Sequence, residues 1–387
     1  MTEPADIFDP RHYAAVRRPP AEAESPPPWV YTSDAFFARE VERVFRHSWN
    51  CVGRTDYIEK PGDYFTRELV GIPLIVLRDR DGTIRAFANS CRHRGAQLLE
   101  GAGNCRAIKC PYHGWVYGLD GTLTGAPGME AARDFAREQH GLRPIRLDCR
   151  GGFIFVNFDD EAAGLDVWLG GWGPLFDCYR LEDMVTVRRW EGEIAANWKL
   201  ATEVFIEEYH APVVHQTTLY RRPLTMHRYD EVPGAYATVF GAHEGSRALI
   251  EGRGHRPFPP IPTLEGQAKA GTRWTVTYSG FCFAVTIDSM WFIECYPLGP
   301  NRTRYAWVNC FPRSTAACAD YSTIAPGYYE RWDVAVVEDN AILERQQRGL
   351  ASPFARPGRL QPRMEPIVAH LGRWLTERVI GNAPTVG

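Results

Sequence analysis

Two mixed pairs of metal-binding residues constrain this chain more than any other feature. Cys91-Arg92-His93 is followed, after sixteen residues, by Cys110-Pro111-Tyr112-His113. This order suits a [2Fe-2S] cluster in which two thiolates hold one iron and two imidazoles hold the other. Neutral imidazoles donate less charge than thiolates, so such a cluster is easier to reduce and works at roughly −150 to +300 mV. The pairs therefore predict a centre that passes one electron at a time.

A structural zinc site is the alternative, because two Cys and two His also bind zinc. Zinc fingers usually place a Cys pair before a His pair. Here each pair is mixed and lies on a loop between strand-like segments, and the second is followed by the hairpin turn signal Asp120-Gly121. Ligand order and loop context favour the iron–sulfur cluster. Its expected ligands are Cys91, His93, Cys110 and His113.

The segments CRHRGA and CPYHGW resemble the cluster loops of Rieske proteins. Rieske proteins of respiratory chains carry an extra Cys in each loop, and the two form a disulfide. The corresponding positions here are Ala96 and Tyr112, which cannot form one. The resemblance therefore implies the oxygenase and ferredoxin type, whose cluster usually feeds electrons to a catalytic iron.

Length and composition bound the remaining possibilities. The chain has 387 residues, which suggests two or three domains, and 44% hydrophobic with 24% charged residues is typical of a globular protein. A net charge of −3 gives no reason to expect nucleic acid or a membrane surface as a partner. No apolar run approaches a membrane span, and the acidic N-terminus does not resemble a signal peptide. A cytoplasmic location with reduced cysteines is expected.

The pattern of elements predicts three segments. Residues 1–48 comprise a Pro-rich arm, expected to be extended, and a helix that Ser33 or Asp34 can cap; the segment should pack with the catalytic domain. Residues 49–160 show short strands and turns and contain the cluster loops, and residues 161–387 should form the catalytic domain. Within that domain we expect a final helix from near Tyr328 and strands around 185–192, 274–279, 281–296 and 303–310.

A second pair of His residues lies downstream of the cluster loops. A helical run from Leu200 to His210 is expected to end at Pro212, and His215 follows. Two His and one carboxylate on one face of a ferrous iron leave positions open for O2 and substrate. A Pro between the two His can bring both rings to one metal, although such a pair alone is more often structural.

The run NWKLATEVFIEEYHAPVVH resembles the catalytic segment of Rieske non-haem iron oxygenase α-subunits. The resemblance places His210 and His215 at the two metal-binding positions. It places Glu207 at the acid that bridges the iron to the cluster of a neighbouring subunit, with Glu208 as the alternative. The chain departs from the family at Val204, where many members have Asn.

The third iron ligand is expected from a later helix. The segment from Trp332 to Leu350 resembles the family stretch that supplies a carboxylate ligand, and Asp339 matches the ligand position. Most helical carboxylates lie on a solvated face. The other carboxylates of this segment, which we expect on the solvated face of the helix, are Glu338, Asp333 and Glu344.

The resemblance covers about residues 30–350 and implies both fold and activity. The fold would be α+β, with an all-β Rieske [2Fe-2S] domain inserted in a helix-grip (START-like) catalytic domain that has an antiparallel sheet and a long C-terminal helix. The chain would be the terminal oxygenase of a multicomponent system, a mono- or dioxygenase with a [2Fe-2S] cluster and a mononuclear Fe(II). A reductase, with or without a ferredoxin, would supply electrons from NAD(P)H, and the subunits would form a homo-oligomer, a head-to-tail trimer.

The substrate is left open by the sequence. The family hydroxylates, dihydroxylates or demethylates small molecules, including aromatic compounds in hydrocarbon catabolism and quaternary amines. Arg253 and His255 either bind an anionic substrate or belong to a solvated loop. A pure electron carrier with a non-catalytic second domain is the alternative function. Aromatic residues that form either a cation-binding cage or ordinary core are Trp274, Tyr278, Phe281, Phe283, Trp291 and Phe292.

Overall fold

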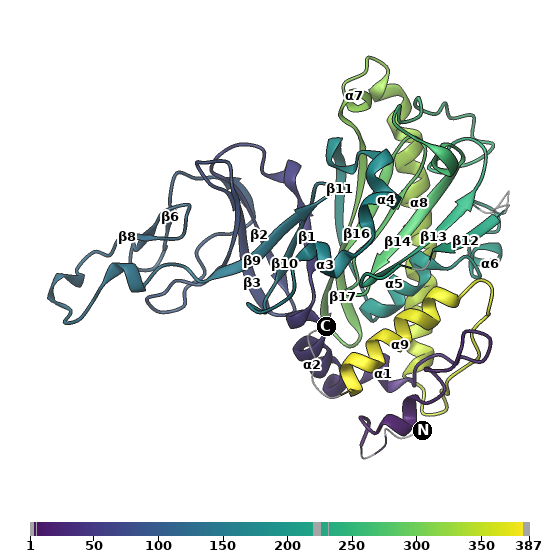
Figure 1. Ribbon diagram of the computed structural model, residues 1–387, viewed down its shortest axis with the longest axis horizontal. Helices are drawn as coiled ribbons and strands as arrows, with labels where there is room; N and C mark the ends of the chain where they lie inside the picture. Colours follow the sequence, from purple (N-terminus) through teal and green to yellow (C-terminus); the bar gives the residue numbers. More distant parts are fainter. Residues whose placement is uncertain (1–3, 5, 220–225, 231, 382–387) are drawn as a thin grey trace. The chain divides into compact units, whose positions relative to one another are not determined.

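The computed structural model describes residues 4, 6–219, 226–230 and 232–381. The chain divides into two compact units (Figure 1). One unit combines residues 1–46 with 163–387, and the other spans residues 47–162. The second unit is thus an insertion between two parts of the first.

The unit at 47–162 is built from strands alone, apart from short 3₁₀ turns. Its larger sheet is antiparallel, in the order β1-β10-β9-β4-β3-β2-β5. The strands of this sheet are β1 (Asn50–Arg54), β2 (Asp63–Leu69), β3 (Ile72–Arg78), β4 (Ile84–Ala88), β5 (Ala102–Asn104), β9 (Pro144–Arg150) and β10 (Phe153–Asn157). A smaller sheet contains β6 (Ile108–Lys109), β7 (Val116–Tyr117) and β8 (Leu123–Gly125).

The smaller sheet carries the predicted hairpin. β7 and β8 pair antiparallel, and the turn between them contains Gly121 at φ 86°. A Cβ atom there would lie 2.5 Å from the ring of Phe87, so the position needs glycine for both its backbone angle and its space. This close approach joins the hairpin to the core of the larger sheet.

The other unit contains a second antiparallel sheet, in the order β11-β17-β16-β15-β14-β13-β12. The predicted strand at 281–296 is two strands joined by a turn. The strands of this sheet are β11 (Met184–Ile194), β12 (Met226–Asp230), β13 (Tyr236–Ala242), β14 (Gly271–Thr277), β15 (Cys282–Val285), β16 (Met290–Gly299) and β17 (Arg302–Pro312).

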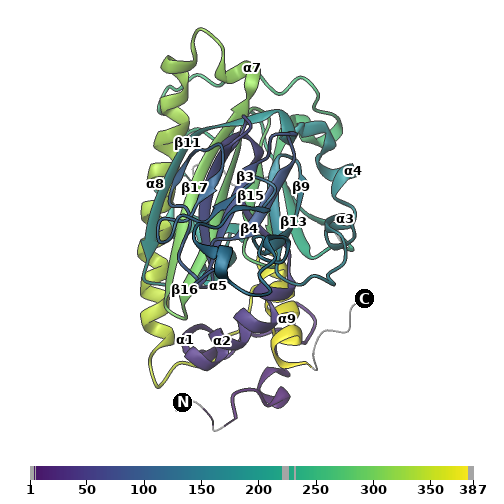
Figure 2. The ribbon, with the colours of Figure 1, turned by 90° about the vertical axis from the view of Figure 1, so that its left-hand side faces the viewer.

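Helices cover both faces of this sheet. The 3₁₀ turns aside, they are α1 (Trp29–Thr32), α2 (Asp34–Arg43), α3 (Leu165–Leu169), α4 (Trp172–Phe176), α5 (Trp198–Ile206), α6 (Ala211–Val214), α7 (Arg313–Ala316), α8 (Tyr321–Leu350) and α9 (Pro366–Ile380). Figure 2 shows α8 on one side of the sheet and the α3–α4 pair on the other.

The strand alternation explains why both faces are apolar. Neighbouring residues of a strand point to opposite faces. On one face Phe283 packs against Trp172 of α4, with ring centroids 5.3 Å apart. On the other face Trp291 packs against Trp332 of α8 at 4.7 Å. The long helix is therefore held by the sheet along the face that also carries Asp339.

Three helix boundaries differ from the predictions. α8 begins at Tyr321, earlier than expected, and α9 was not predicted at all. α5 ends at Ile206, not at Pro212. Glu207 is extended, and its carboxylate accepts the backbone N–H groups of Tyr209 and His210, which starts α6 as a separate helix. Pro212 lies in the first turn of α6, where a missing N–H has no cost.

The N-terminal arm is not extended. Residues Pro10–Tyr13 form a 3₁₀ turn, and Tyr13 is fully buried with its hydroxyl donating to the carbonyl of Ile7 at 2.5 Å. Ser25 N–H donates to the carbonyl of Gly358 at 2.8 Å. Ser33 caps α2 as expected, by accepting the N–H of Phe36. The N-terminal segment therefore folds together with the last helices, with α2 near α9 and α1 near α8 (Figure 1).

The α+β fold class, with an all-β unit inserted in a helix-and-antiparallel-sheet unit that carries a long C-terminal helix, is confirmed. Among the described residues, no helix combines the length and apolar character needed to cross a bilayer.

A buried ion pair joins the N-terminal segment to the helix that precedes the His pair. Lys199 Nζ of α5 lies 2.6 Å from Glu40 Oε1 of α2, and the two side chains are 1% and 0% exposed. Trp198 Nε1 donates to the other oxygen of Glu40 at 3.3 Å. Burial raises the pKa of Glu40 and lowers that of Lys199, and the pairing opposes both shifts.

We expect Lys199→Met to destabilise the 1–46/163–387 unit, because it leaves the Glu40 carboxylate buried without a cation. Removing one partner of a buried pair costs about 3–5 kcal/mol. Scanning calorimetry should show a lower melting temperature for Lys199→Met and substantial recovery in Glu40→Leu/Lys199→Met. An unchanged melting temperature of Lys199→Met would show that the Glu40–Lys199 ion pair does not stabilise this unit.

Candidate metal centres and substrate cavity

The two predicted cluster loops have matching backbone turns. Gly95 N–H donates to the carbonyl of Cys91 at 2.9 Å, and Gly114 N–H donates to the carbonyl of Cys110 at 3.1 Å. Both glycines have positive φ, 75° and 72°, a conformation that other residues adopt at a cost. Each loop therefore folds back on its Cys and turns the following His toward the other loop.

The four predicted cluster residues converge. Cys91 and Cys110 are 3% and 2% exposed. The Nδ1 atoms of His93 and His113 lie 3.1 Å apart, and the His93 ring stacks on Trp115 with centroids 4.8 Å apart. The thiols are buried while the His113 ring is exposed. Two buried sulfurs beside two facing Nδ1 atoms fit a cluster with a covered thiolate end and an accessible imidazole end.

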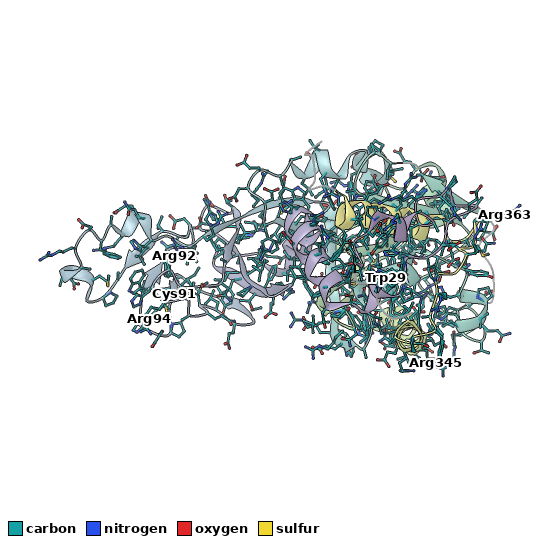
Figure 3. All side chains as sticks on the ribbon, turned by 90° about the horizontal axis from the view of Figure 1, so that it is seen from below. Trp29, Cys91, Arg92, Arg94, Arg345 and Arg363 are labelled. Atoms are coloured by element: carbon teal, nitrogen blue, oxygen red, sulfur yellow. The ribbon has the colours of Figure 1, made fainter. Side chains whose placement is uncertain are left out.

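The surroundings of Cys110 favour its thiolate. Burial alone would raise its pKa, but hydrogen bonds from the backbone N–H groups of Tyr112 and His113 and from Cys91 outweigh burial and lower the pKa. Tyr117 Oη lies 3.2 Å from Cys91 Sγ and accepts the N–H of Arg92 at 3.1 Å. Figure 3 shows Cys91, Arg92 and Arg94 together at one end of this unit.

The three predicted iron ligands also converge, in the other unit. His210 precedes α6, His215 follows it, and Asp339 lies on α8. One ligand atom from each residue lies within 4.8 Å of the others. Asp339 Oδ1 is 3.0 Å from His215 Nε2 and 3.7 Å from His210 Nε2. This set has the two imidazoles and one carboxylate of a facial triad.

A carboxylate lies on the far side of each imidazole. His210 Nδ1 lies 2.5 Å from Glu207 Oε1, and His215 Nδ1 lies 2.7 Å from Glu338 Oε2. An Nδ1–H that donates to a carboxylate leaves Nε2 free to bind a metal and makes it more basic. Glu338, expected on a solvated face, instead supports His215 and also accepts the hydroxyl of Thr218 at 2.8 Å.

A second observation, the hydrogen bonding of Asp339, also indicates a metal ion between the three predicted ligands. Asp339 Oδ1 is buried and accepts no hydrogen bond within the part of the chain that the structure describes, although both Nε2 atoms are near it. A buried carboxylate oxygen without a donor is unusual. A cation held between this oxygen and the two Nε2 atoms would satisfy it.

A cavity of about 910 Å³ opens beside these ligands. Its walls come from the α5–α6 segment, the sheet, the loop after β13 and one face of α8. Residues of its lining include Val204, His210, His215, Trp274, Trp291 and Asp339. The volume is that of a site for a small organic molecule.

The remaining predicted residues are divided between this cavity and other places. Trp274 and Trp291 line it, whereas Phe281, Phe283 and Phe292 are buried in the core. The cation-binding cage of six aromatic residues therefore does not form. Arg253 and His255 both contact Glu330, at 3.6 and 2.7 Å, and His255 also lines the cavity.

The two other helical carboxylates that were expected on a solvated face do not belong to the triad. Asp333 pairs with Arg188 at 2.8 Å, and Glu344 accepts the N–H of Ala195 at 3.3 Å.

The sequence analysis did not single out Arg247 and Arg331, which line the cavity. Arg331 lies on α8, two helical turns before Asp339, and Arg247 lies in an irregular segment. The helical spacing of eight residues from Asp339 could have indicated Arg331. No local pattern indicates Arg247.

Two family models match the chain. Residues 48–136 match the Rieske [2Fe-2S] domain, and residues 181–381 match the ring hydroxylating alpha subunit (catalytic domain). The first range contains the two cluster loops. The second contains the His210/His215 pair and Asp339.

Individual relatives match over most of the chain. The chloroplastic choline monooxygenase of Spinacia oleracea is 29% identical over 384 residues, 97% of this chain and 83% of the relative. The glycine betaine monooxygenase oxygenase subunit of Chromohalobacter salexigens is 34% identical over 364 residues, 85% of this chain and 80% of the relative.

A solved structure shares the whole fold. It is a quaternary ammonium Rieske monooxygenase, described with carnitine oxidation by gut microbiota and inter-subunit electron transfer. It superposes with a TM-score of 0.80 at 25% identity, covering 93% of this chain and 96% of its own. The predicted [2Fe-2S] cluster and mononuclear iron are the cofactors of the two matched domains. The chain belongs to the ring-hydroxylating α-subunit family of Rieske non-haem iron oxygenases.

Proposed function

We propose that this chain oxygenates a small organic molecule bound in the cavity beside His210, His215 and Asp339, using O2 and electrons from a partner reductase. The observation that carries the proposal is the convergence of these three ligand atoms at the wall of a cavity of about 910 Å³. A pure electron carrier needs neither the triad nor the cavity.

The roles of the residues follow from the geometry. Cys91 and Cys110 would hold one iron of the cluster, and His93 and His113 would hold the other. His210, His215 and Asp339 would hold the mononuclear iron. When bound, the cluster supplies single electrons and the mononuclear iron supplies the positions at which O2 is activated.

We propose domain boundaries that follow these roles. Residues 1–48 serve the catalytic domain, residues 49–160 form the Rieske domain, and residues 161–387 form the catalytic domain. The two compact units at 47–162 and at 1–46 with 163–387 support this division.

The substrate class comes from the relatives. Two of them are named for choline and glycine betaine, and the similar structure is described with carnitine oxidation, so quaternary amines are the first class to test. Aromatic compounds are the second class, because ring hydroxylation gives the matched family its name. Screening both classes for stimulated O2 uptake with a surrogate reductase tests the proposal.

We propose a closed head-to-tail ring of three subunits, in which the cluster of one subunit donates to the iron of the next. The exposed imidazole end of the cluster suits such a transfer. Glu207 would bridge the two centres, because it already holds His210 Nδ1 and could accept a hydrogen bond from the neighbour's cluster histidine. The inter-subunit electron transfer described for the similar structure supports this arrangement.

Replacing a triad residue should empty the mononuclear site alone. We expect His210→Ala, His215→Ala and Asp339→Ala to lower bound iron from about three to about two per chain and to abolish turnover, with the cluster absorption unchanged. Asp333→Ala, on the same helix, is the matched control and should keep all the iron. An Asp339→Ala protein with full iron would move the third ligand elsewhere. Two irons in the unaltered protein would instead favour the electron carrier.

Glu207→Gln should keep both metal centres and slow turnover by roughly 10- to 100-fold, because the acceptor beside His210 loses its charge. Metal analysis and single-turnover kinetics separate the two effects. If Glu208→Gln slows turnover and Glu207→Gln does not, the bridge belongs to Glu208. Full activity of a dilute monomer would rule out transfer between subunits.

Replacing a cluster histidine should lower the reduction potential. His113→Cys adds a thiolate, which donates more charge than imidazole, so potentiometric titration should move toward the roughly −400 mV of all-cysteine clusters. A colourless protein that contains only zinc would refute the cluster assignment.

A further inference from the structure

One partly buried cation of the substrate cavity has no anionic partner among the described residues. Arg331 lines the cavity from α8, and its guanidinium lies over the rings of Trp291 and Trp332, at 5.3 and 5.1 Å. Among the described residues it forms no hydrogen bond and no ion pair. Burying a cation without an anion is costly, so a partner from outside the chain would stabilise it.

A second cation, Arg247, lies close to Arg331. Burial and the neighbouring Arg247 lower the pKa of Arg331 to about 10, and Asp339 opposes the shift. At that value Arg331 stays charged at neutral pH. Burial and Arg247 lower the pKa of His243, which also lines the cavity, to about 4. Two arginines and a neutral histidine therefore line this cavity.

The carboxylates that line the same cavity do not neutralise Arg331. Glu207 contacts His210, and Asp339 faces the two imidazoles. Glu244 is exposed, and Glu251 has interactions of its own. Glu208 likewise has another interaction, and none of the five forms an ion pair with Arg331 within the described residues.

The position of Arg331 disfavours a purely cationic substrate there. A quaternary ammonium group binds on aromatic faces, but Arg331 already lies over Trp291 and Trp332. Asp339 follows Arg331 by eight residues on the same helix, about 12 Å along its axis. A molecule several bonds long can therefore contact Arg331 at one end and approach the triad with the other.

We propose that the substrate of this cavity carries a carboxylate, which Arg331 binds. A guanidinium presents two parallel N–H donors that match the two oxygens of a carboxylate. The rest of the substrate extends toward His210, His215 and Asp339. The inference rests on the proposed oxygenase function and narrows its substrate class to organic acids, including zwitterions with a carboxylate.

Two matched pairs of probes test the proposal by isothermal titration calorimetry on the metal-loaded protein. Glycine betaine and choline share a trimethylammonium group, and only the first has a carboxylate. Benzoate and benzyl alcohol share an aromatic ring, and only the first is an anion. Each compound is titrated to tens of millimolar into the unaltered protein and into Arg331→Gln, Arg331→Lys and Arg345→Gln.

We expect the carboxylate of at least one pair to bind roughly 10- to 100-fold more tightly than its partner, as for a hydrogen bond to a charged group. Arg331→Gln should remove this preference, and Arg331→Lys should keep part of it. Arg345 is exposed on the same helix (Figure 3), so Arg345→Gln should keep the full preference. Melting temperatures show whether each variant is folded.

The proposal is overturned if neither carboxylate binds the unaltered protein more tightly than its partner, or if Arg331→Gln weakens both members of a pair equally. The second result would mean that Arg331 only shapes the cavity. Because calorimetry needs no turnover, its outcome is separable from the oxygenase activity. A protein that consumes O2 with choline but ignores carboxylates would keep the proposed function and reject this inference.

Discussion

The carboxylate of Glu207 controls the local geometry on which the catalytic site depends. It accepts the backbone N–H groups of Tyr209 and His210, which ends α5 and starts α6. Its other oxygen holds His210 Nδ1, so the opposite nitrogen faces Asp339. One side chain thus sets the backbone turn, the ring orientation and the proton position of the same histidine. His215 then follows after a single helical turn.

The long helix α8 supplies the other half of the site. Glu338 and Asp339 are adjacent, yet one supports His215 Nδ1 and the other faces Nε2 of the same ring. The imidazole is therefore held from both sides by one helix. This arrangement requires α8 to be fixed against the sheet, which the packing of Trp332 against Trp291 provides. The guanidinium of Arg331 lies over the same two rings, so the contact that holds the helix also positions a cation of the cavity.

Local patterns predicted the parts of this protein that are local in sequence. The cluster loops, the Ser33 cap and the hairpin at Gly121 depend on residues within a few positions of one another. The predicted end of α5 was wrong because a side-chain carboxylate competes with the helix for backbone N–H groups. Helix propensities do not describe this competition. The hydrogen bond of Glu338 to His215 and the position of Arg331 in the cavity depend on contacts between segments that are distant in the sequence. Local patterns therefore could not predict them.

The insertion of one unit within the other has a consequence for the order of synthesis. Residues 47–162 are complete when the second half of the chain has yet to be made, whereas α2 must wait for Lys199 of α5 and for α9 at the far end. Domains tend to fold as units while the chain emerges from the ribosome. The cluster unit can therefore fold early around its own cysteines, and the N-terminal segment remains without its core partners until α9 has been made.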